Sequence, residues 1–164
     1  MDGALWSKLV HVVAAIWMVG GMVGRLVAHR AAQRATGIET MQAMLGLVEF
    51  FDARMVIPAS SLLLIFGLLT AWLQGWPILG FLQGGAVNWV LASLLLTLSI
   101  LPVVAFVLSP RRSRRARLLE EAVAAGRVTP ELTSALDDRA LFAARLYESA
   151  VVAVVTALMV LKPF

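Results

Sequence analysis

Histidine offers the most varied chemistry of any residue type in this sequence, and the chain contains 2 of them. His11 lies near the start of the apolar stretch KLVHVVAAIWMVGGMVGRL, residues 8–26. An imidazole in such a place can stay neutral and hydrogen-bond a hydroxyl or carbonyl group, bind a haem iron as an axial ligand, or act as a pH sensor or proton relay. The sequence leaves these three interpretations of His11 open.

The second histidine restricts the haem interpretation. His29 follows on the same predicted helix, about 27 Å farther along its axis, so the two histidines of one chain cannot bind the same iron. What remains is a five-coordinate haem on His11, ligation by His11 together with Met159 or Met22, or two copies of His11 across a homodimer. His29 itself, within AHRAAQR, is expected to be a solvated residue at the membrane surface.

Polar side chains occur at one depth in each of the four predicted spans, close to the ends opposite the arginine-rich segments. If all of them face the centre of a bundle, they form an internal hydrogen-bonded layer. Its members are His11, Thr70, Ser93 and Thr156.

Charged side chains gather at the other ends of the same spans. Residues 149–161, between Glu148 and Lys162, extend only about 20 Å as a helix, less than the ~30 Å thickness of a bilayer's hydrocarbon core. The fourth span must therefore enter the membrane before Glu148, which then needs a cationic partner such as Arg25 or Arg54. We predict an inner collar of paired charges that sets the helix register, with a proton or substrate gate as the alternative. Its members are Arg25, Glu49, Asp52, Arg54, Arg145 and Glu148.

The elements that position these residues are predicted from composition. The chain has 164 residues, of which 60% are hydrophobic and 15% charged, whereas about 25% of an average soluble domain is charged. No charged side chain occurs from Met55 to Pro110, a stretch that suits two membrane spans. We predict an all-α polytopic membrane protein, a four-transmembrane-helix bundle that forms a single integral membrane domain over residues 1–164. The spans are expected at roughly 5–28, 55–74, 86–108 and 142–162.

Two arginine-rich segments, residues 29–54 and 109–141, connect the spans in pairs. By the positive-inside rule both are cytoplasmic and both termini external, in the inner (plasma) membrane. Short amphipathic helices are predicted in these segments: one over 38–51 at the membrane surface, one ending at Gly126, and one that begins at the Thr129 N-cap and runs directly into the fourth span. An aromatic belt is then expected at the outer interface, made of Trp6, Trp72, Trp76 and Trp89.

The arginines that follow the third span are expected to enforce this topology and to contact anionic lipid headgroups. They are Arg111, Arg112, Arg114, Arg115 and Arg117. Since the arginines flank the spans, the net charge of +4 does not indicate nucleic-acid binding. The sequence has no cysteine and no phosphate-binding loop, nucleophile triad, HExxH motif or cluster of metal ligands. We therefore predict no catalytic residue and no metal site.

Several stretches resemble known sequences: KLVHVVAAIWMVGG followed by a basic residue, FFDARMVIPASSLLLIFGLLTAW, the arginine-rich segment after the third span, and VLKP near the end. Over most of the chain they are similar to bacterial predicted integral membrane proteins, a four-span family of unknown function. The first helix, with Lys8, His11, a Trp-x-x-Gly-Gly motif and an arginine, also resembles that of HemJ protoporphyrinogen oxidases and CopD copper-resistance proteins. The HemJ resemblance implies haem b bound through His11.

The departures from those two families matter for function. The third span lacks the intramembrane lysine expected of a HemJ-like oxidase, and no methionine and histidine cluster suits copper transport. Because groups that do chemistry are scarce, we predict a non-enzymatic accessory or structural membrane component, acting as a homo-oligomer or within a larger membrane complex. The alternative is a haem b-binding membrane redox protein, a haem-dependent oxidoreductase if it is an enzyme, with His11 as axial ligand. A carrier for a small solute or ion is a further alternative, although no inverted repeat or broken-helix pair is visible.

Overall fold

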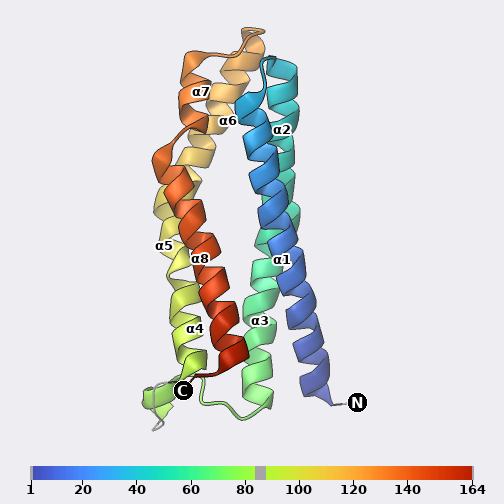
Figure 1. The fold of residues 1–164 in the computed structure, drawn as a ribbon, viewed down its shortest axis with the longest axis vertical. Coiled ribbons are helices and arrows are strands. Elements are labelled where there is room, and N and C mark those ends of the chain that lie inside the picture. Colours follow the sequence, from blue (N-terminus) through green and yellow to red (C-terminus); the bar gives the residue numbers. More distant parts are fainter. Residues whose placement is uncertain (1, 84–87, 164) are drawn as a thin grey trace.

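A computed structural model of the protein describes residues 2–83 and 88–163. Long helices lie side by side in an elongated bundle (Figure 1). Both termini lie at one end of it, here called the terminal end, and the α1–α2 and α6–α7 connections lie at the other, here called the charged end. Helices long and apolar enough to cross a membrane are Gly3–Arg34, Ile38–Leu73, Trp89–Ala124 and Pro130–Leu161. The predicted four-helix membrane bundle is thus confirmed.

The first half of the bundle is a helical hairpin. Helix α1 runs from Gly3 to Arg34, and Ala35 at its C-cap is already extended. Helix α2 (Ile38–Phe51), the π-helical segment η1 (Asp52–Val56) and helix α3 (Ile57–Leu73) then form one continuous rod that returns along α1 (Figure 1). Residues 38–51, which the sequence suggested as a helix along the membrane surface, instead extend the second span beyond its apolar part.

The second half is built in the same way. After a short 3-10 turn, η2 (Gly80–Gln83), helix α4 (Trp89–Leu98), helix α5 (Ile100–Val103), the π-helical segment η3 (Val104–Leu108) and helix α6 (Ser109–Ala124) follow one another along one rod. Asn88 caps α4, and its side-chain oxygen accepts hydrogen bonds from the N–H groups of Val90 and Leu91. Part of the predicted connection before this rod and the expected start of the third span, residues 84–87, lie outside the described residues.

Prolines account for the two π-helical segments. Segment η1 ends two residues before Pro58 and segment η3 two residues before Pro110. A proline inside a helix donates no hydrogen bond, and its ring clashes with the carbonyl group four residues earlier. Those carbonyls belong to Arg54 and Phe106, one in each π segment. A wider turn at these points lets the helix pass the proline without breaking.

The charged end is completed by a break that the sequence did not predict. Helix α7 (Pro130–Leu136), capped by Thr129, stops at Asp137, and helix α8 (Arg139–Leu161) starts anew, so α7 does not run directly into the fourth span. Asp138 causes the restart, because its carboxylate accepts hydrogen bonds from the N–H groups of Ala140 and Leu141. Burial by itself raises the pKa of the Asp138 carboxyl, but these hydrogen bonds and the Arg111 guanidinium outweigh it and lower the pKa.

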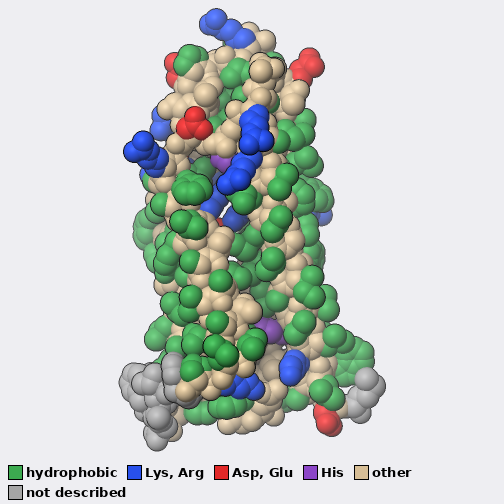
Figure 2. Space-filling model, in the orientation of Figure 1, with side chains coloured by type: hydrophobic (Ala, Val, Ile, Leu, Met, Phe, Trp, Pro, Cys, Tyr) green, Lys and Arg blue, Asp and Glu red, His purple; other side chains and the backbone are tan. Residues whose placement is uncertain are grey.

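The most completely buried apolar cluster lies at the charged end and joins all the helices there. Its members are Ala32, Met41, Leu45, Ala122, Leu132 and Leu136. Along the spans, by contrast, only 17–22% of each apolar window is buried, and large hydrophobic side chains cover the outside of the bundle (Figure 2). This distribution fits a lipid solvent around the spans, because apolar outer faces are stable there, and water around the charged end.

The tryptophans at the terminal end do not all face outward. Trp72 is 68% exposed and Trp6 51%. Trp76 and Trp89 instead pack edge to face with 5.3 Å between their rings, and the Lys162 ammonium lies 5.7 Å from each ring centre. These two rings therefore close the terminal end of the bundle and do not belong to an exposed belt.

Candidate functional site

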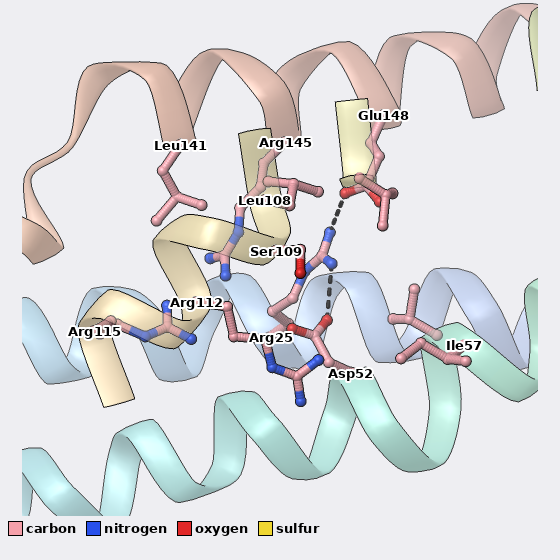
Figure 3. A pocket seen from close by; sticks show the side chains of 12 residues that line it. Arg25, Asp52, Ile57, Leu108, Ser109, Arg112, Arg115, Leu141, Arg145 and Glu148 are labelled. Atoms are coloured by element: carbon pink, nitrogen blue, oxygen red, sulfur yellow. Dashed lines mark hydrogen bonds and ion pairs between the residues drawn. The ribbon is translucent and has the colours of Figure 1, made fainter. Parts of the chain in front are cut away.

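A buried ion triad joins three helices near the charged end. Arg25 of α1 is 5% exposed, and its Nη1 donates to Asp52 Oδ1 at 2.8 Å while its Nη2 donates to Glu148 Oε2 at 2.7 Å. Figure 3 shows the guanidinium held between the two carboxylates. The single guanidinium group of Arg25 thus forms ion pairs with two carboxylates. One ion pair connects α1 to η1, and the other connects α1 to α8.

Helix periodicity places the members of this triad. On α8 the buried residues Leu141, Ala144, Glu148 and Val151 recur at spacings of three and four, so Glu148 points inward on an otherwise apolar stripe. Asp52 opens the π segment η1. On α1, Arg25 belongs to the buried face, together with Gly21 and Ala28.

A second ion cluster lies beside the triad and was not predicted. Arg115 is 5% exposed, and its Nη2 donates to Glu49 Oε1 at 2.8 Å. Arg112 forms an ion pair with the other oxygen of the same carboxylate. Both arginines were expected to contact lipid headgroups, because the third span was predicted to end before them. In the structure the helix continues through them, which turns Arg115 inward together with Ala122, seven residues later.

Between these clusters lies a cavity of about 180 Å³ to which all four rods contribute. Its lining comprises Arg25, Asp52, Val56, Ile57, Val104, Leu108, Ser109, Arg112, Arg115, Leu141, Arg145 and Glu148. Arg145 extends from α8 toward this space (Figure 3). Its Nη1 is buried and has no hydrogen-bond partner among the residues that the structure describes.

The predicted inner collar is therefore assembled only in part. The structure connects Arg25, Asp52 and Glu148, places Glu49 with Arg112 and Arg115, and leaves Arg145 near both groups. Arg54, the alternative partner suggested for Glu148, is exposed and lies on the outside of the bundle. The π turn that contains Arg54 directs Asp52, and not Arg54, toward α1.

His11 lies at the contact between α1 and α3. Its Nδ1 is 3.0 Å from the Leu63 carbonyl oxygen, and a carbonyl only accepts, so Nδ1 carries the proton and Nε2 the lone pair. The ring packs tightly against Gly67, where an added Cβ would lie 2.9 Å from His11 Cε1. A residue larger than glycine at position 67 would thus displace the imidazole.

The four polar residues that the sequence placed at one depth do not form one hydrogen-bonded layer. Thr70 bonds Ser7, with 2.8 Å between the hydroxyl oxygens, and His11 bonds the α3 backbone. Ser93 is buried, and its hydroxyl has no partner among the described residues. Thr156 is exposed and donates to Val152 of its own helix. The depth of each residue along its span could be predicted from its position in the sequence, but the rotation of each helix about its axis could not.

One observation supports haem binding by His11, and another excludes one of the predicted second ligands. The His11 tautomer leaves Nε2 free to bind a metal, and a ligating histidine usually donates its other N–H in this way. Of the second ligands considered, Met22 lies about 16 Å farther along the unbroken helix α1 and packs against Met18, Val56 and Ala59. It cannot share an iron with His11. Met159 packs in the cluster of Ala71, Trp89 and Val90.

His29 corrects another expectation. It is only 8% exposed, and its Nε2 lies 3.2 Å from the carbonyl oxygen of Leu136, which also accepts a hydrogen bond from Gln33. Helix α1 projects beyond the apolar region, so its last turns are covered by α7 and not by water. His29 therefore helps to attach α7 to α1.

Comparison with known proteins identifies a family of integral membrane proteins but assigns no activity to it. Residues 5–163 match the model of a family described as "Predicted integral membrane protein (DUF2269)". No curated protein and no solved structure matches the chain. The predicted resemblance to integral membrane proteins of unknown function is confirmed, and the match covers every residue of the cavity described above.

Proposed function

Because the chain belongs to the DUF2269 family of predicted integral membrane proteins, we propose that it is a non-enzymatic accessory or structural component of the bacterial plasma membrane. The observation that carries the proposal is the use made of its intramembrane polar groups. Arg25 connects three helices, Ser7 bonds Thr70, and His11 bonds the Leu63 carbonyl. These polar side chains therefore join the spans to one another.

The outer surface supports the same proposal. Bulky apolar side chains project from the lipid-facing side of the spans, among them Phe106, which is 78% exposed, and Val160, which is 75% exposed. Such a surface can contact either lipid tails or a neighbouring transmembrane helix. Replacing lipid by a helix changes the free energy little, because both are apolar. A bundle held rigid by internal polar contacts can therefore present these faces to a second copy or to another membrane chain.

Photo-crosslinking tests this role directly. A photoreactive residue in place of Phe106 is expected to form a discrete adduct with another membrane polypeptide in living cells, because that side chain has the highest exposure among the large hydrophobic side chains of the described residues. Replacement of Val151, which is 5% exposed, is the matched control and should give no adduct. Adducts with lipid alone, from Phe106 and from other lipid-facing positions around the bundle, would contradict an accessory role.

The orientation follows from charge. We propose spans at roughly 5–28, 55–74, 86–108 and 142–162, with residues 29–54 and 109–141 in the cytoplasm and both termini external, because arginines gather at the charged end. The cysteine-free chain suits labelling. In intact cells a membrane-impermeant maleimide should label Gly3→Cys and leave Ser113→Cys unlabelled until the cells are opened, since both positions are exposed on the surface. The reverse pattern would invert the proposed topology.

A second candidate function is haem b binding, which the tautomer of His11 favours because Nε2 keeps its lone pair. When bound, haem would supply one-electron chemistry, and His11 would hold the iron. The visible spectrum of the protein purified in mild detergent from haem-replete cells decides between the two candidates. A stoichiometric haem band that disappears in His11→Ala would favour haem binding over the accessory role. A colourless, folded preparation would remove this second candidate and leave the first.

A further inference from the structure

Around the cavity near the charged end, four guanidinium groups face three carboxylates when Glu49 at its edge is included, so one positive charge is in excess. Guanidinium groups of Arg25, Arg112, Arg115 and Arg145 line it, against the carboxylates of Asp52 and Glu148. Arg25 engages both of these carboxylates. Glu49, at the edge of the cluster, is shared by Arg112 and Arg115. The guanidinium group of Arg145 makes no hydrogen bond or ion pair with any residue that the structure describes, and its Nη1 is buried.

Arg145 is only partly buried, but shielding a guanidinium group from water without a direct ion-pair partner is still costly, because its desolvation is not compensated. The carboxylates around the cavity already form ion pairs with other arginines, Asp52 and Glu148 with Arg25, and Glu49 with Arg112 and Arg115. A structural arginine would be expected to make such a pair, as Arg25 and Arg115 do. An unpartnered arginine directed into a cavity is instead suited to receive an anion from outside the chain.

Both π-helical segments border the same cavity. Asp52 and Val56 of η1 and Val104 and Leu108 of η3 are all part of its lining. Single π turns within α-helices occur frequently at functional sites. Here the prolines that induce them lie on separate spans, yet both widened turns meet at one place. This convergence is a second observation that marks the cavity, independent of the charges.

We propose that the cavity binds the phosphate group of an anionic ligand, with Arg145 as its principal contact. Guanidinium groups bind phosphate oxygens in a bidentate manner, and Arg112 and Arg115 add positive charge at the same opening. The lining also contains the apolar side chains of Ile57, Val104 and Leu108. Such a mixed lining suits the headgroup of an anionic phospholipid, and a small soluble phosphate shares the same chemistry.

This site differs from headgroup contact on the outer surface. Arg114 and Arg117 are exposed and belong to that surface, whereas Arg145 reaches the cavity from the fourth span. The inference does not depend on the accessory role proposed above.

The test measures the thermal midpoint of the purified protein in mild detergent as three probes are titrated: short-chain phosphatidylglycerol, short-chain phosphatidylcholine and inorganic phosphate. Ligands that bind only the folded state raise the midpoint. We expect phosphatidylglycerol to raise it and phosphatidylcholine not to. Arg145→Gln should weaken the response by about tenfold to a hundredfold in apparent affinity, the effect of losing charge-assisted hydrogen bonds. Arg117→Gln, the matched surface control, should respond like the wild type.

The midpoint without added probe separates a binding role from a structural one. If Arg145 is a ligand-binding residue, Arg145→Gln is at least as stable as the wild type in probe-free detergent, because a charge without an ion-pair partner is removed. A lower midpoint for the unliganded variant would overturn the proposal, as would an equal response of wild type and variant. Competition by inorganic phosphate would identify a soluble phosphate as the ligand, and its absence would identify the lipid headgroup.

Discussion

Replacing Arg25 with glutamine is expected to destabilise the bundle by about 3–5 kcal/mol, the usual cost of removing one partner from a buried ion pair. The reason is that Arg25 serves both Asp52 and Glu148, at 2.8 and 2.7 Å. Glutamine would leave the carboxylates of Asp52 and Glu148 without their ion-pair partner, in a site where both side chains are largely shielded from solvent. Unfolding in mixed micelles with increasing denaturing detergent measures the loss, followed by the fluorescence of the tryptophans.

Two further variants make this result specific. Arg54→Gln removes an exposed arginine three residues from the end of α2 and should change the free energy of unfolding by no more than about 0.5 kcal/mol. The triple variant Arg25→Met, Asp52→Asn, Glu148→Gln removes all three charges and should recover most of the loss, because a neutral replacement of a buried ion group is often tolerated. If Arg25→Gln behaves like Arg54→Gln, the triad does not hold the spans together.

Leu132→Ala is expected to cost about 2–5 kcal/mol, the range measured when a fully buried leucine is truncated. Leu132 is 0% exposed and lies in the apolar cluster of the charged end, with Ala32, Met41 and Leu45. This cluster lies outside the apolar spans, so the hydrophobic effect operates there as it does in a soluble protein. Helix α7 is short and is held by Leu132 and Leu136, so it should detach first.

Limited trypsin digestion in detergent reports that detachment. Cleavage after Arg127 and Arg139, which flank α7, should become faster in Leu132→Ala, and backbone amides of α7 should exchange hydrogen sooner. Leu47→Ala is the matched control, since Leu47 lies on α2 near the same end but is 43% exposed. Equal cleavage rates in the two variants would mean that α7 is not held by this cluster.

Much of the architecture was predictable because lipid imposes a local rule. A membrane span is recognised from a run of apolar residues, and the uncharged stretch from Met55 to Pro110 required two of them. The relative depth of Arg25 and Glu148 was also a local property, obtained by counting along each helix, and the two side chains lie together in the structure. Pro58 and Pro110 carried the signal for the π segments, although their consequence for the helix was not foreseen.

Rotation of each helix about its axis, and its course beyond the membrane, depended on contacts between distant segments. The exposure of Arg54 and Thr156, the burial of His29 and Arg115, and the unpaired Nη1 of Arg145 are all of this kind. An arginine near a span end looks the same in sequence whether it faces lipid headgroups, Glu49 or a cavity. Its neighbours on other helices differ by many residues in the chain, and only their packing selects among these outcomes. A span can be predicted because hydropathy depends only on the composition of a short stretch of sequence. The direction in which a side chain points depends on the packing of the whole bundle, so only the tertiary structure determines it.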